Sequence, residues 1–134
     1  MLTPPAHHAP ATAISRDYFL AAIAEVESRN NPNAIGPKGE RSAYQITRRT
    51  WEQHDPRHPF GMFANNPAIA LRVASEHYYW LIASLKQIGL DPSALNLATC
   101  WRLGLARGSR RIRSGATLPD SAQRVVNLYA SLSP

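Results

Sequence analysis

The 134-residue sequence has one cysteine, two lysines and no long apolar run. The single Cys100 excludes an internal disulfide and a cysteine-rich metal site. It lies in an apolar segment, so we expect a buried thiol rather than a nucleophile. No stretch approaches the roughly 18 apolar residues of a membrane span. Residues 1–13 show neither the basic nor the apolar region of a signal peptide, so none is expected and the localisation stays open.

Positive charge comes almost wholly from arginine. The net charge is +6, with thirteen arginines, of which five fall between Arg102 and Arg113. Such a run favours a polyanionic partner, which includes nucleic acid, an anionic membrane surface and bacterial wall polymer. A solvated basic face without a partner is the alternative. Because no helix-turn-helix, zinc-finger or RNP pattern accompanies the run, we expect no specific nucleic-acid partner.

Length and composition predict one folded domain, since 134 residues with 44% hydrophobic side chains can bury a substantial core. The proline-containing residues 1–14 are expected to form a flexible arm, and residues 15–134 the domain. The pair His7-His8 has no further ligands at helical spacing, so we expect no metal site there.

Apolar periodicity and capping residues predict five helices. They are residues 16–29, a short helix after Thr47 that carries Trp51, residues 66 to about 88, a helix from Asp91-Pro92 to about 105, and residues 122–132. Residues 33–44 predict a loop or small β-hairpin, residues 54–65 an irregular connection, and residues 107–116 a basic loop. His54, Asp55 and His58 are potential metal ligands, but the breakers around them argue against a metal site.

Glu27 has the position of a general acid. Pro32 has no N–H and biases Asn31 away from the α region, so the first helix should end near Arg29 or Asn30. Glu27 then lies in the last turn, where the negative end of the helix dipole disfavours its ionisation. A carboxyl that keeps its proton near neutral pH suits acid catalysis. Glu25, on the other side of the apolar stripe, is expected to be structural or exposed.

Two motifs resemble a known family. The first reads Glu27-Ser28-x-x-Asn31-Pro32-x-Ala34, and the second reads Gly39-x-x-Ser42-Ala43-Tyr44-Gln45-Ile46. Together they resemble the soluble lytic transglycosylase and goose-type lysozyme family, the SLT domain. The resemblance implies a mainly helical α+β, lysozyme-like fold with about five helices and a small β-hairpin that lines a glycan cleft.

The resemblance also implies chemistry. It makes Glu27 the catalytic acid for the β-1,4 bond between N-acetylmuramic acid and N-acetylglucosamine of bacterial peptidoglycan, in a monomer without metal or cofactor. Substrate binding is expected from Ser28, Tyr44, Gln45, Trp101 and Arg102. One motif departs from the family: its Tyr-Asn-Ala-Gly is Trp101-Arg102-Leu103-Gly104 here. The tyrosine hydroxyl that supports the glutamate is therefore missing, although an indole N–H is also a donor.

The second carboxylate decides between mechanisms. If Glu40 holds a water, the enzyme is an inverting, lysozyme-type hydrolase; without such a group the substrate's own hydroxyl closes an anhydro sugar. Glu40 can instead be an exposed turn residue paired with Lys38 or Arg41. We prefer the transglycosylase because the first motif is closest to that branch. Asp55 is the fallback water-holding group, and an inactive glycan-binding module is the third reading.

Overall fold

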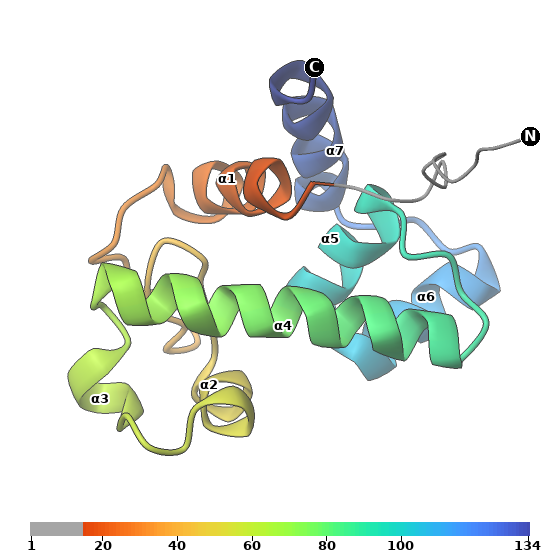
Figure 1. Ribbon diagram of the computed structural model, residues 1–134. Coiled ribbons are helices and arrows are strands. Elements are labelled where there is room, and N and C mark those ends of the chain that lie inside the picture. The colour runs from red at the N-terminus through yellow and green to blue at the C-terminus, as the bar shows by residue number, and fades with distance from the viewer. Residues whose placement is uncertain (1–14) are drawn as a thin grey trace, which may run out of the picture.

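The computed structural model describes residues 15–134 and is built around one long central helix, α4 (Pro67–Gln87). In the view of Figure 1, α1 (Arg16–Ser28) and α7 (Asp120–Leu132) lie above α4, and α2 (Arg48–His54) and α3 (Phe60–Phe63) lie below it. α5 (Ala94–Leu103) packs against α7 and against α6 (Leu105–Ser114), and α1 also packs against α7. The expected arm and the pair His7-His8 fall outside the described residues.

Local capping rules predict several helix ends correctly. Asn66 caps α4 by accepting the N–H of Ile69 at 3.1 Å, and Pro67 occupies the first turn. Thr47 caps α2 by accepting the N–H of Thr50 at 3.2 Å. α5, which was expected to begin at Asp91-Pro92, begins later because Ser93 is its N-cap. These contacts satisfy backbone donors that the first turn of a helix leaves free.

The predicted count of five helices is wrong, because residues 15–134 form seven. The short α3 lies in the segment expected to be irregular, and α6 replaces the expected basic loop. In α6 the inward positions are Leu105, Gly108 and Ile112, which recur at helical spacing. This inward face is hard to recognise in the sequence, because the segment is rich in arginine and Gly108 has no apolar side chain.

Gly108 sets the distance between α5 and α6, and its replacement by alanine is expected to destabilise the fold. A Cβ there would lie 2.7 Å from the Cys100 sulfur and 3.0 Å from the Cys100 Cα. Because backbone cannot move aside cheaply, we expect Gly108→Ala to cost about 1–3 kcal/mol in the free energy of unfolding. The matched control is Gly61→Ala in α3, where a Cβ meets nothing within 4 Å. Denaturant unfolding measures the stability of both variants. Equal free energies of unfolding for Gly108→Ala and Gly61→Ala would contradict the packing argument.

The expected β-hairpin is absent from residues 15–134. Residues 35–46 form only two isolated bridges, Ile35 with Arg41 and Arg41 with Ile46. Three residues in this segment have positive φ: Gly39 at 84°, Ser42 at 77° and Gln45 at 52°. These turns fold the chain back too often for two extended runs to pair. The segment is a compact loop, so the predicted mainly helical fold is confirmed, and its β component is corrected because residues 15–134 contain no strand.

The core lies where α4 meets its neighbours. Its fully enclosed side chains include Phe19, Ile23, Trp51, Leu81, Leu85, Leu97 and Val125. Trp80 and Ile88 lie outside this core and are 36% and 37% exposed. Cys100 is a buried free thiol as predicted, and burial raises its pKa to about 11. The thiol is therefore protonated at neutral pH and unreactive.

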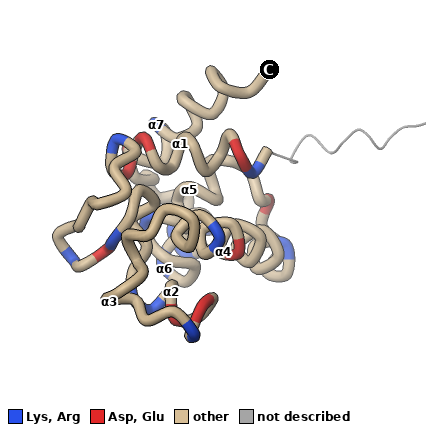
Figure 2. The backbone as a smooth tube through the Cα atoms, turned by 60° about the vertical axis from the view of Figure 1, so that its left-hand side comes forward, with Lys and Arg blue, Asp and Glu red and all other residues tan. Residues whose placement is uncertain are grey.

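The basic run does not form one uniform patch. Arg111 donates to the carbonyl of Thr117 at 2.8 Å and so holds the connection between α6 and α7. Arg113 donates to the carbonyl of Ile88, the C-cap of α4. Figure 2 shows lysine and arginine positions spread over several elements rather than gathered on α6 alone. Of the five arginines in the run, Arg102 is the one that reaches the glutamate in the first motif.

Candidate active site

The chain reversal after α1 fixes the position of Glu27. Arg29 and Asn30 both adopt the left-handed conformation, with φ of 57° and 58°. Their N–H groups bond back to the carbonyls of Glu25 and Ala24, at 2.8 and 2.9 Å, which closes the last turn. The helix therefore ends at Ser28, so Glu27 lies in its last turn as the Pro32 signal predicts.

Glu27 is nearly enclosed and makes one ion pair. Its side chain is 6% exposed, and its Oε1 accepts a hydrogen bond from Nη1 of Arg102 at 2.8 Å. Burial raises the pKa of Glu27, and the nearby charge of Glu40 acts in the same direction. The charge and hydrogen bond of Arg102, and more weakly the charge of Arg124, oppose this rise. Opposing influences thus meet on one carboxyl group.

Ser28 connects the end of α1 to the second motif. Its hydroxyl oxygen lies 2.8 Å from the carbonyl oxygen of Ala43 and 3.1 Å from that of Ala24. The same oxygen accepts the N–H of Asn31 at 3.0 Å. These contacts hold the two motifs together, and the expected contact between Ser28 and substrate stays a prediction.

Glu40 and Gln45 meet over Gly36. A Cβ on Gly36 would lie 2.4 Å from Oε1 of Gln45 and 2.7 Å from Oε1 of Glu40. Glu40 also accepts the backbone N–H of Lys38 at 2.8 Å, and Gln45 donates from Nε2 to the carbonyl of Ser42 at 2.9 Å. Both side chains are partly buried. Glu40 is therefore a partly buried carboxylate that is bonded to the Lys38 backbone and whose charge acts on Glu27. Its catalytic role stays a prediction.

Trp101 fixes the backbone of Tyr44. Its indole Nε1 donates to the Tyr44 carbonyl at 3.0 Å, across 57 residues of sequence. The indole is packed between Phe19 and His77, with ring centroids 6.2 and 4.9 Å away. The indole N–H, the expected alternative to the missing tyrosine hydroxyl, therefore donates to the loop and not to Glu27. Substrate contacts of Tyr44 and Trp101 stay predictions.

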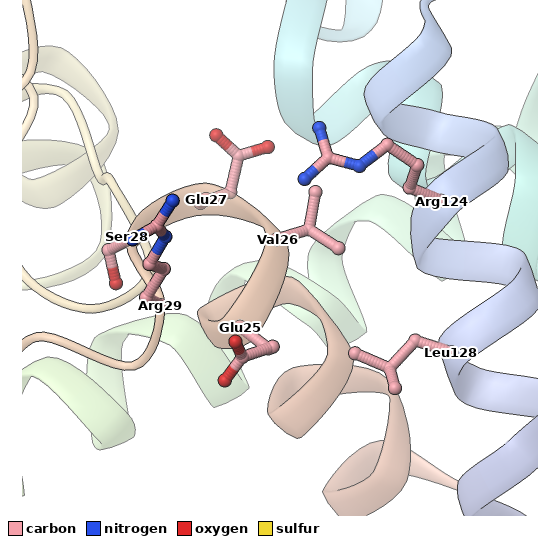
Figure 3. A pocket seen from close by; sticks show the side chains of 7 residues that line it. All are labelled: Glu25, Val26, Glu27, Ser28, Arg29, Arg124 and Leu128. Carbon is pink, nitrogen blue, oxygen red and sulfur yellow. The ribbon is translucent and has the colours of Figure 1, made fainter.

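Two pockets flank this region. The larger measures about 560 Å³ and is lined by Glu25, Val26, Glu27, Ser28, Arg29, Arg124 and Leu128. Figure 3 shows the Arg124 side chain extending from α7 toward the end of α1. The smaller measures about 240 Å³ and includes Tyr44 beside Pro32 and Pro67. Glu27 and Tyr44 thus border two openings on either side of the Ser28 contact.

Comparison with known families decides what this arrangement belongs to. The family model described as Transglycosylase SLT domain matches residues 8–118, which is more than half of the chain. The chain belongs to this SLT family. The family carries peptidoglycan lytic transglycosylase-type activity on a lysozyme-like fold. No curated protein and no solved structure matches the chain.

Membership confirms the predicted family and its peptidoglycan substrate class. In this SLT domain the two motifs lie together, because the Ser28 hydroxyl at the end of α1 contacts the Ala43 carbonyl of the compact loop. The catalytic and binding roles of their residues stay predictions. None of the helices in residues 15–134 is long and apolar enough to cross a bilayer.

Sequence reasoning missed the surroundings of Glu27. Arg102 was expected to bind substrate, and its ion pair with Glu27 joins residues 75 positions apart. Arg124, on the last helix of this SLT domain, was not singled out at all, although it lines the larger pocket. No local signal could have found either contact, because both depend on how α5 and α7 pack beside α1.

Asp55, the fallback water-holding group, is buried and already hydrogen-bonded within the protein. Its side chain is 1% exposed, and its oxygens accept from Arg72, from Nδ1 of His58 at 2.8 Å, and from the N–H groups of Arg57 and His58. Burial alone would raise the pKa of Asp55, but these hydrogen bonds hold it below its usual value. Across residues 15–134, no three metal-ligating side chains cluster, so His54, Asp55 and His58 form no such site. In this SLT domain Asp55 organises the loop between α2 and α3.

Proposed function

We propose that this SLT domain cleaves the β-1,4 bond between N-acetylmuramic acid and N-acetylglucosamine, with Glu27 as its general acid. The observation that carries the proposal is the enclosed Glu27 carboxyl at the wall of a pocket of about 560 Å³. Burial raises the pKa of this group, which favours the protonated form that acid catalysis requires. The sugars would have to approach along the end of α1 and the loop that contains Tyr44 and Gln45.

The proposed reaction needs one carboxyl group in two successive roles. Glu27 donates its proton to the glycosidic oxygen, and the bond from that oxygen to the anomeric carbon of muramic acid breaks as positive charge develops. The C6 hydroxyl of the same sugar then bonds to the anomeric carbon. Glu27, now a carboxylate, accepts the proton of that hydroxyl and is restored. The products are a 1,6-anhydromuramic end and a free hydroxyl on the leaving sugar.

The contacts around Glu27 support positioning roles for its neighbours. Ser28 and Trp101 fix the loop backbone at Ala43 and Tyr44. We propose that Tyr44 and Gln45 contact the glycan from this fixed loop. Preorganised groups of this kind contribute by holding reactants in the reactive geometry.

Glu40→Gln is expected to leave the rate within about twofold of wild type, because the proposed reaction uses no water-holding base. An inverting hydrolase would instead lose roughly 10²–10⁴ in rate on this change. Glutamine keeps the acceptor for the Lys38 N–H, so the loop should persist. Initial rates on purified peptidoglycan measure the effect.

Mass spectrometry of the released fragments tests the proposal itself. Anhydro ends support the transglycosylase, and reducing ends, heavier by one water, support the hydrolase with Glu40 as base. A silent Glu40→Gln with only reducing ends would overturn both assignments. The inactive glycan-binding module remains a second candidate because Arg102 pairs directly with Glu27. Loss of turbidity in a suspension of purified murein would exclude it, and binding without cleavage would favour it.

A further inference from the structure

The two partners of the Glu27–Arg102 ion pair are very unequal in freedom. The Glu27 side chain is 6% exposed and belongs to a closed helix turn, whereas the Arg102 side chain is 53% exposed. Arg102 lies in the last turn of α5, just before Gly104 ends that helix. If the pair separates, the arginine is therefore the partner that can move into solvent.

The contact also leaves most of the guanidinium available. It is a single hydrogen bond from Nη1 to Oε1 at 2.8 Å, while a guanidinium carries five N–H donors. Arginine binds carboxylates best through two parallel hydrogen bonds. A second carboxylate that approaches from solvent can thus form the stronger, bidentate contact with Arg102.

We propose that Arg102 recognises a carboxylate on the peptide stem of the glycan strand and exchanges Glu27 for it when substrate binds. This inference rests on the proposed function. Where a peptide is attached, the lactyl carboxyl of N-acetylmuramic acid is consumed in the amide bond to that peptide. The carboxylate of a peptide-bearing strand must therefore come from the peptide. Arg102 is then both a binding residue and the switch that lets Glu27 take up a proton from water in the complex.

The charges around Glu27 agree with this exchange. Arg102 comes from α5, Arg124 from α7 and Glu40 from the compact loop, and these charged groups have the strongest effects on the pKa of Glu27. Glu25 and Arg29, its neighbours on and just after α1, line the same pocket. Once Arg102 has moved, burial and the charge of Glu40 both favour the protonated carboxyl, and the charge of Arg124 opposes them. Glu27 would therefore take up its proton in the enzyme–substrate complex rather than in the free enzyme.

Two pH profiles test the proposal, because kcat/KM reports ionisations of the free enzyme and kcat those of the complex. With a peptide-bearing tetrasaccharide as substrate, the wild-type basic limb of kcat should lie at higher pH than that of kcat/KM. In Arg102→Gln the kcat/KM limb should move up to meet the kcat limb, whereas Arg102→Lys should keep the two apart. Arg110→Gln, an equal charge loss at an exposed position of α6, should leave both limbs in place.

The source of the carboxylate is tested with the same tetrasaccharide after its stem carboxylates have been amidated. We expect KM for wild type to rise about tenfold, as loss of a charged hydrogen bond implies, and the kcat limb to fall back to that of kcat/KM. Arg102→Gln should not distinguish the two substrates. Coincident limbs in wild type, or limbs that Arg102→Gln does not move, would overturn the exchange. An active Glu27→Gln variant would refute the proposed function instead, so the two failures are distinguishable.

Discussion

Glu27→Gln is expected to lower kcat on peptidoglycan by about 100-fold or more, because glutamine has nearly the same shape and cannot donate a proton. Binding should be retained, since the neighbouring loop does not depend on the charge of Glu27. The matched control is Glu52→Gln on α2, an exposed carboxylate whose ion pair with Arg48 spans 3.7 Å. It should keep wild-type activity. A Glu27→Gln enzyme with more than about a tenth of wild-type kcat would remove Glu27 from the acid role.

The stability of the same variant provides a second readout. The folded-state pKa of Glu27 lies above its ordinary value, so its ionised form destabilises the fold at pH values above that folded pKa. Below the ordinary pKa of a glutamate, the group is neutral in both states and the penalty vanishes. Glu27→Gln should therefore unfold at a temperature equal to or higher than wild type at neutral pH. Its advantage should shrink as the pH falls toward 4. A variant that is less stable than wild type at neutral pH would show that the ion pair outweighs burial.

Asp55→Asn is expected to destabilise the protein by about 2–3 kcal/mol, the second large effect, while leaving the glycan site intact. The change weakens the hydrogen bonds from Arg72 and His58 to a group that is 1% exposed. Arg72 is 41% exposed, so water can solvate it afterwards and the loss stays below that of a fully buried pair. Because the pKa of Asp55 is depressed, its stabilisation is present above the ordinary pKa and is lost as the pH falls through the folded value.

Denaturant unfolding of Asp55→Asn beside Asp17→Asn measures this effect. Asp17 is 79% exposed and pairs with its neighbour Arg16 at the surface, so its replacement should change stability by less than about 0.5 kcal/mol. Equal losses in the two variants would contradict the structural role of Asp55. A large loss of kcat in a folded Asp55→Asn enzyme would revive its assignment as a water-holding group.

Sequence alone predicts the features that depend on neighbouring residues. The caps at Thr47 and Asn66 and the chain reversal before Pro32 follow from local hydrogen bonding and from the geometry of proline. The motif around Glu27 is found for the same reason, because it lies within one helix end. Local rules also explain why the long helix α4 was easy to recognise, since a strong start signal precedes a wide apolar face.

The missed features depend on contacts between distant segments. α6 was taken for a loop because its helix is stabilised by Gly108 against Cys100, which a hydrophobic pattern does not register. The hairpin was expected from turn residues, but Ser42 and Gln45 add left-handed turns of their own. The pairing of Arg102 with Glu27 could not be read from the sequence, since Glu27 lies in the first motif and Arg102 lies 75 residues later, in the motif that departs from the family.

The hydrogen bond from Trp101 to the carbonyl of Tyr44 has a consequence for the order of folding. It joins the loop after α1 to a helix 57 residues further along the chain, and Arg102 beside it reaches back 75 residues to Glu27. Closing such long loops costs conformational entropy before the contacts can stabilise the chain, so we expect these contacts to form late in folding. A nascent chain would have made α1 and α4 long before it could assemble a competent site. Glycan cleavage would then report the docking of α5 against α1 and the compact loop.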